Sequence, residues 1–114
     1  MLHNKTKVIV QYYTRNELER GEYEDILDRE VTLNMRYELS VNKYNTKYMP
    51  GDDDDLTVKH GKLSTANMRF TVAALRNRKL IKLFIAGVEY RILDIIPYTI
   101  VKGCECVIKE GSWQ

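Results

Sequence analysis

Long apolar runs are missing from this chain. None of its 114 residues belongs to a hydrophobic stretch approaching the roughly 20 residues that a helix needs to span a bilayer. The polar segment 1–7 is not followed by the apolar stretch that marks a secretory signal. We therefore expect synthesis in a cytoplasm and no membrane partner. A chain of this length fits one compact domain, which would cover residues 1–114.

Cysteine and histidine are scarce, which limits metal binding. The two cysteines, Cys104 and Cys106, are two positions apart and would share one face of a strand. Two thiols without a nearby histidine or further cysteine do not make a zinc site, and a disulfide between them would need strained geometry. We interpret them as buried thiols that act as small apolar residues.

Recognisable catalytic motifs are also missing. The sequence contains no nucleophile elbow, phosphate-binding P-loop, zinc-protease helix motif or dinucleotide fingerprint. His3 and His60 lie far apart, and no motif supplies either of them with a nucleophile to activate. We therefore predict that the protein is not an enzyme and needs no cofactor.

The acidic run Asp52, Asp53, Asp54 and Asp55 invites the hypothesis of a calcium site. An EF-hand loop starting at Asp53 would need glycine at its sixth place and glutamate at its twelfth, where Val58 and Ser64 stand. The motif fails, and no metal site is predicted. Three interpretations stay open, namely a solvated and self-repelling loop tip, a loose divalent site, or acidity that serves a partner.

Neither sign of charge dominates the chain, whose net charge is +2. Residues 1–57 hold 8 Lys and Arg against 12 Asp and Glu, whereas residues 58–114 hold 10 against 4. Strong attraction of the whole molecule to nucleic acid is therefore not implied. The asymmetry allows head-to-tail contact between the acidic and basic faces of neighbouring copies.

Alternating apolar residues give the clearest structural signal. From Val31 to Val41 every second residue is apolar and those between are polar, which predicts a long strand with one buried face. The earlier segment 7–13 is rich in β-branched and aromatic residues and predicts another strand. The polar segment 16–22 then predicts the turn between two antiparallel strands, with the second beginning near Tyr23.

The C-terminal third predicts a β-hairpin unit over residues 80–110. A strand at 80–85 is followed by Ala86 and Gly87, a turn in which glycine takes positive φ at little cost. The return strand covers 88–96 and ends at Pro97, which cannot donate to a ladder. Lys102 and Gly103 predict the next turn, and residues 104–110 predict the last strand.

Between these regions the pattern weakens. Residues 42–64 collect polar residues, glycine and proline, which predicts a long loop with room for a short extended piece at 57–59. Residues 68–72 alternate and favour a strand over the rival helix, which Ser64 would cap and which would reach Leu75. Residues 76–79 are then a charged turn. Together the segments predict an all-β protein, a small antiparallel β-barrel of about six strands with one long central loop that projects at about residues 42–64.

Tyrosine and basic residues admit a second kind of function, a small nucleic-acid-binding β-barrel of the OB type. The tyrosines that could stack bases are Tyr12, Tyr13, Tyr37, Tyr44 and Tyr48. The tyrosine-rich half is also the acidic half, which favours strand packing and protein contacts instead. The densest basic cluster is interpreted as a solvated turn, as an interface for an acidic patch of a neighbouring subunit, or as an interface for a phosphate backbone. Its members are Arg76, Arg78, Lys79 and Lys82.

The order of these elements resembles that of the head-closure proteins, also called stopper or head-tail joining proteins, of tailed bacteriophages with long non-contractile tails. The resemblance lies in the C-terminal third. It comprises a strand, the x-Gly turn Ala86-Gly87, a return strand of the type Tyr-x-Ile-x-x-Ile from Tyr90 to Ile95, and a final strand ending in charged residues. In the N-terminal part the layout matches, and the loop at 42–64 matches in position and length.

The resemblance implies a β-barrel that forms a dodecameric ring beneath the portal and adaptor, in the neck of the virion. Such a ring closes the DNA-filled head and docks the tail, so its partners would be further copies of itself, the adaptor or portal, tail-terminator or tail proteins, and the end of the packaged DNA. In that family the long central loop projects into the channel and helps to retain DNA. The corresponding gating residues here would be Pro50, Gly51, Asp52, Asp53, Asp54 and Asp55. Another connector or tail component of similar build is an alternative.

Overall fold

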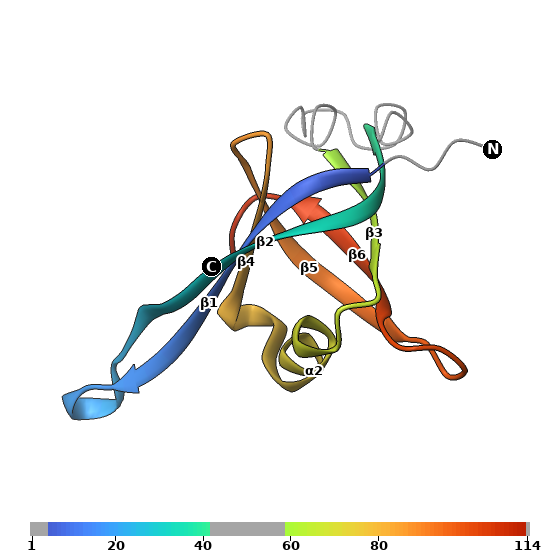
Figure 1. The fold of residues 1–114 in the computed structure, drawn as a ribbon. Helices are drawn as coiled ribbons and strands as arrows, with labels where there is room; N and C mark the ends of the chain where they lie inside the picture. The colour runs from blue at the N-terminus through green and yellow to red at the C-terminus, as the bar shows by residue number, and fades with distance from the viewer. Residues whose placement is uncertain (1–4, 42–58, 114) are drawn as a thin grey trace, which may run out of the picture.

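The computed structural model describes residues 5–41 and 59–113. The described residues form six strands, one α-helix and two short 3₁₀ helices (Figure 1). In chain order these elements are β1 (Lys5–Glu17), η1 (Glu19–Gly21), β2 (Tyr23–Val41), β3 (Lys59–Thr65), α2 (Met68–Asn77), η3 (Arg78–Leu80), β4 (Ile81–Ile85), β5 (Val88–Pro97) and β6 (Cys104–Glu110). None of the helices in this part of the chain is long and apolar enough to cross a membrane.

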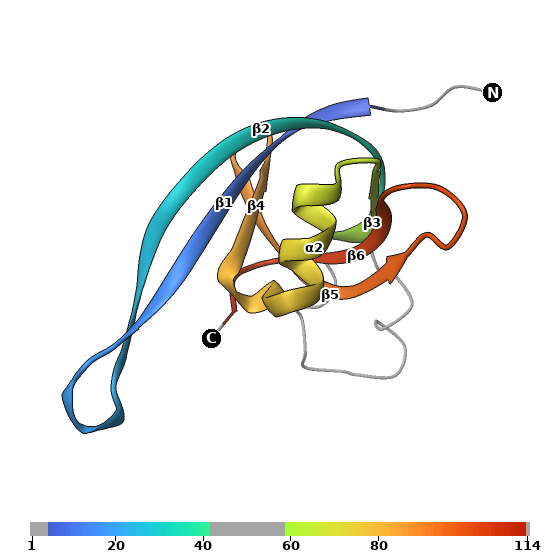
Figure 2. The ribbon, with the colours of Figure 1, turned by 60° about the horizontal axis from the view of Figure 1, so that its bottom comes forward.

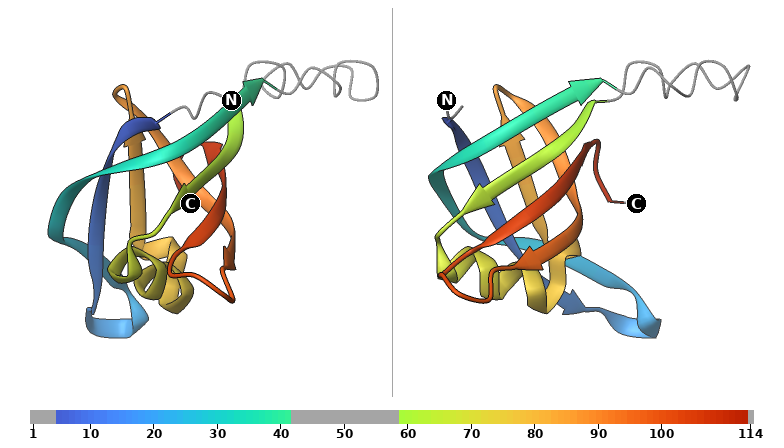
Figure 3. Two further views of the ribbon diagram at one scale, coloured as in Figure 1. Left: turned by 45° about the vertical axis from the view of Figure 1, so that its right-hand side comes forward. Right: turned by 90° about the vertical axis from the view of Figure 1, so that its right-hand side faces the viewer.

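The strands pair antiparallel and close into a ring in the order β1-β2-β3-β6-β5-β4, with β4 returning to β1. The right panel of Figure 3 shows the strands around this ring. The predicted all-β fold of about six antiparallel strands is therefore confirmed. The last strand has the predicted bounds, and Ala86 and Gly87 both have positive φ, as a tight hairpin turn requires.

The core lies inside the ring and follows from the alternation along each strand. On β2, Val31, Leu33 and Met35 face inward while the residues between them are exposed. Cys104 and Cys106 lie side by side on β6 as free, buried thiols, which confirms their interpretation as core residues. The other fully buried strand residues include Val8, Val10, Leu63, Leu83, Tyr90, Ile92 and Ile108.

The strand predicted at residues 68–72 is wrong, because these residues begin the helix α2. Asn67, not Ser64, caps the helix, and its side-chain oxygen accepts a 2.8 Å hydrogen bond from the Phe70 amide. Phe70 and Ala74, four residues apart, point into the end of the ring and join the core. The charged segment 76–79, predicted as a turn, forms the end of α2 and the start of η3.

The long loop predicted at 42–64 is wrong in its last part. Residues 59–65 form β3, which pairs with β2 on one side and with β6 on the other. Two ladders satisfy the backbone of this polar strand, so it needs only Leu63 in the core. The proposed gating residues lie at 50–55, outside the described residues, and so do Tyr44 and Tyr48.

The hairpin of β1 and β2 is longer than the ring. Within the ring, β1 pairs with β4 only from Ile9 to Tyr12. On the other side of the hairpin, β2 pairs with β3 only from Arg36 onward. A bulge follows Tyr12, where Asp28 has no partner in the register. Beyond it the two strands pair only with each other and leave the body of the molecule (Figure 1). We call residues 13–28 the arm.

Candidate functional site

Large exposed apolar side chains gather on three projections of the fold. Twelve large apolar side chains are exposed among the described residues, and only that of Ile9 lies outside these projections. They are Leu18, Tyr23, Ile26 and Leu27 on the arm, Met68, Val72 and Leu75 on α2, and Ile96, Tyr98, Ile100 and Val101 at the end of β5 and in its connection to β6. Scattered single residues of this kind are ordinary, whereas grouped ones mark interaction sites.

The arm is ordered by its own contacts. Arg15 forms an ion pair with Asp25 at 2.9 Å, and its guanidinium lies 5.5 Å from the centre of the Tyr23 ring. The hydrogen bond from Arg15 lowers the pKa of the Asp25 carboxyl. At the tip, the Leu18 amide donates to the Glu22 carbonyl at 2.7 Å. The arm therefore presents its apolar side chains on a defined two-stranded support.

The helix α2 has one face for the core and another for solvent. The side chains of Phe70, Thr71 and Ala74 lie on the buried face of α2. Met68, Val72 and Leu75 follow the helical spacing of four and three residues and are 42–53% exposed. Figure 2 shows α2 lying across one end of the ring of strands, with the arm directed away to the side. We call the exposed side of α2 and η3 the helix surface.

The predicted interface residues lie near one another in the chain but have different surroundings. Arg76 is exposed at the end of α2. The side chains of Arg78 and Lys79 lie over the Trp113 ring, at 5.8 and 5.5 Å from its centre. Lys82 lies 5.0 Å from the centre of the Tyr13 ring, at the base of the arm. Cation–π contacts of this kind attract each cationic side chain to its ring.

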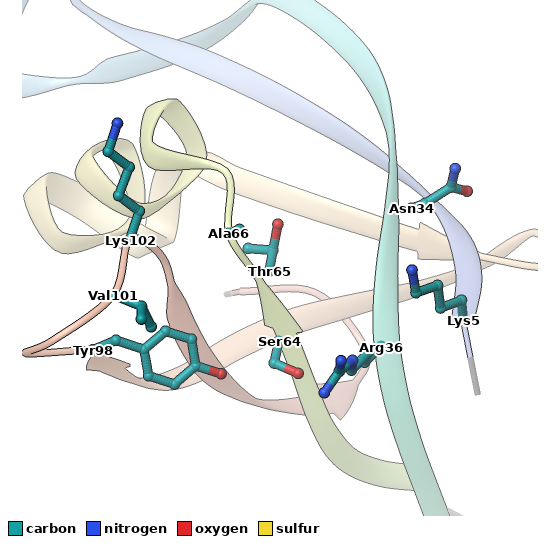
Figure 4. A pocket seen from close by; sticks show the side chains of 9 residues that line it. All are labelled: Lys5, Asn34, Arg36, Ser64, Thr65, Ala66, Tyr98, Val101 and Lys102. Atoms are coloured by element: carbon teal, nitrogen blue, oxygen red, sulfur yellow. The ribbon is translucent and has the colours of Figure 1, made fainter. Parts of the chain in front are cut away.

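A basic pocket of about 470 Å³ lies elsewhere, between β1, β2, the end of β3 and the connection from β5 to β6. Its lining has three cations, Lys5, Arg36 and Lys102, and no carboxylate. Figure 4 shows the Tyr98 hydroxyl directed toward the side of the pocket that holds Ser64 and Arg36. Such a set can hold an anion. No sequence motif could reveal it, because four separate segments supply its residues.

The two cysteines form a buried pair. Their sulfurs are 3.8 Å apart, and the Thr71 hydroxyl donates to the Cys104 sulfur at 3.3 Å. The hydrogen bond from Cys106 lowers the pKa of Cys104 to about 7 against the effect of burial, with help from Thr71. The pKa of Cys106 is raised, first by its hydrogen bond to Cys104 and then by burial. Because neither side chain is more than 1% exposed, substrates cannot reach these thiols.

Metal-binding clusters are missing from the described ranges, where no group of three or more His, Cys, Asp or Glu side chains could hold an ion. The features that the structure does present are therefore surfaces and one basic pocket. Comparison of the chain with protein-family models, curated proteins and solved structures found no match.

Proposed function

We propose that this protein acts by assembly, as a structural component of the head-tail connector in the neck of a long-tailed bacteriophage. In this proposal copies of the chain form a ring below the portal and adaptor, which closes the DNA-filled head and docks the tail. The layout of the sequence, which resembles head-closure proteins, supports the choice of system. The grouping of exposed apolar side chains on three projections is the observation that supports assembly as the mode of action.

Burial of these side chains offers a driving force for assembly. Ile100 is 95% exposed at the end of a loop, where it contributes nothing to the core. Covering such a side chain contributes about 1.5–3 kcal/mol. Each of the three projections carries three or four side chains of this kind, and contacts between chains can cover them together.

The test is to mix the full chain with purified portal–adaptor complexes and to examine the particles by electron microscopy and mass photometry. We expect a ring of added density with the rotational symmetry of the complex. Ile100→Lys should weaken this addition, whereas Ile9→Lys is a control at an exposed isoleucine on the wall of the ring. A chain that adds nothing to the complex but binds oligonucleotides tightly would overturn the proposal.

A second candidate function, nucleic-acid binding, is favoured by the basic pocket. Lys5, Arg36 and Lys102 could contact phosphates, and Tyr98 offers an aromatic ring beside them. This function predicts that the isolated chain binds single-stranded DNA and that the affinity falls steeply with salt. Arg36→Gln should then weaken binding, and an unchanged affinity would exclude the pocket as the site.

A further inference from the structure

We infer that the arm of one copy binds the helix surface of a second copy. The inference deepens the proposed function and rests on its premise that the protein assembles. It assigns a specific contact to two projections that the fold leaves uncovered. The argument uses their charges, their apolar side chains and their positions.

The charges of the two surfaces are opposite. The arm holds two basic residues, Arg15 and Arg20, against six acidic ones, which are Glu17, Glu19, Glu22, Glu24, Asp25 and Asp28. Within the described arm the ion pair of Arg15 and Asp25 neutralises one charge of each sign. Residues 68–80, which form α2 and η3, contain no acidic residue and four basic ones, which are Arg69, Arg76, Arg78 and Lys79. Opposite charges of this kind steer the encounter and fix the orientation of two surfaces.

The apolar side chains of the two surfaces match in extent. Tyr23 and Leu27 share one face of their strand and lie about 13 Å apart, at about 3.3 Å per strand residue, whereas Ile26 lies on the opposite face. The stripe from Met68 to Leu75 extends about 10 Å, at about 1.5 Å per helical residue. Both stripes lie among charged residues, as expected of an apolar patch with a polar rim.

Only the base of the arm lies beside the helix surface of its own chain, where Tyr13 lines one pocket with Arg76 and another with Lys79. The apolar side chains of the arm remain 41–60% exposed, and those of α2 remain 42–53% exposed. Figures 1 and 2 show the tip of the arm displaced to the side, away from α2. A second copy is therefore the partner that supplies the complementary surface.

After one such contact has formed, one copy still has an unoccupied arm and the other an unoccupied helix surface. A third copy can then add by the same contact. An interface between two different patches extends in this way until the rotation closes the assembly into a ring.

The first test is a charge exchange on the full chain. Glu22→Lys with Glu24→Lys reverses charge on the arm, and Arg69→Glu with Arg76→Glu reverses it on α2. Each pair should weaken self-association about tenfold in sedimentation velocity, and mixing the two variants should restore it. Lys7→Glu, on the exposed wall of the ring, is the control and should change little. Failure of the mixture to restore association would overturn the inference.

The second test works when association is weak. Leu27→Cys in one chain and Val72→Cys in another are oxidised together at near-millimolar concentration. We expect a cross-link between the two variants in preference to links between identical chains. The mixture of Leu27→Cys with Ile9→Cys is the matched control. The absence of a cross-link above this control would overturn the inference.

The experiments distinguish failure of the inferred contact from failure of the proposed function. A ring on the portal–adaptor complex without charge rescue or cross-link would leave the proposed function standing and exclude this contact. Rescue and cross-link without any addition to that complex would leave the contact standing and exclude the connector function.

Discussion

Gly103 shows how a single backbone position ties two distant segments together. Its φ is +112°, and an added Cβ would collide with the Thr65 carbonyl and lie 2.7 Å from the Ala66 Cα. Gly103→Ala should therefore destabilise the fold by roughly 2–4 kcal/mol, because neither backbone group can move freely. Urea unfolding followed by circular dichroism measures the loss.

Gly111 is the matched control for this prediction. Its φ of +114° is nearly the same, but the added Cβ would meet the Arg91 Nη1 atom, at the end of a flexible side chain. Gly111→Ala should cost only about 1 kcal/mol, from the backbone conformation. Equal losses in the two variants would show that the close approach at 65–66 contributes little.

The buried thiols lead to a second residue-scale prediction. Cys104 and Cys106 should react with a thiol reagent only after denaturation, because they are at most 1% exposed in the folded chain. The absorbance of the released chromophore gives the number of reacted thiols. Ser112→Cys adds an exposed thiol and should react at once. Fast native reaction of the unsubstituted chain would contradict the packing of β6.

At the scale of elements, the N-cap of α2 leads to a prediction about the stability of the fold. Asn67→Ala removes the acceptor of the Phe70 amide and should lower stability by about 1 kcal/mol. Asn67→Asp keeps an acceptor oxygen and should stay close to the unsubstituted chain. Thermal unfolding compares the three proteins, and an equal loss in both variants would mean that the cap oxygen does not stabilise the helix.

The arm should be separable from the ring of strands. Replacing residues 15–25 by Asn-Gly keeps the paired residues Thr14 and Ile26 and closes them with a tight turn. The fully buried core contains no residue of the arm, so the free energy of unfolding should change little. Self-association should be lost, as measured by sedimentation velocity. Unfolding of the shortened chain would instead make the arm part of the folding unit.

At the scale of the whole molecule, opposite charges make assembly sensitive to salt. The chain divides into an acidic and a basic half, and the inferred contact joins the arm to the helix surface. Raising salt from about 0.05 to about 0.5 M shortens the screening length severalfold and should weaken self-association. Sedimentation velocity at both concentrations checks this. Stronger association at high salt would show that apolar contacts dominate.

Much of the fold could be predicted because the buried face of a strand appears in the sequence as an alternation of apolar and polar residues. The alternation at 31–41 and the turn at Ala86 and Gly87 report local geometry directly. The helix α2 could not be predicted with equal clarity, since Met68, Phe70 and Val72 fit the period of a strand while Met68, Val72 and Leu75 fit that of a helix. The open end of the ring decides between them, because in α2 Phe70 and Ala74 fill it together.

The functional surfaces were harder to predict than the fold. The predicted cluster at Arg76, Arg78, Lys79 and Lys82 lies on or beside the helix surface, but its contacts with Trp113 and Tyr13 join residues distant in the sequence. No sequence pattern predicted the arm, because the bulge at Asp28 does not appear as a feature of the hydrophobic period. The basic pocket depends on four segments that only the closed sheet brings together.

The bulge at Asp28 has a consequence for the geometry of any assembly. It is the point at which the hairpin leaves the ring of strands, so it fixes the angle between the body of a copy and its arm. If the arm binds a neighbour, this angle sets the curvature from one copy to the next. A small change of bend repeats at every copy and accumulates around a closed circle. Substitutions at this one exposed position would then alter how many copies a circle contains, while each individual contact stayed intact.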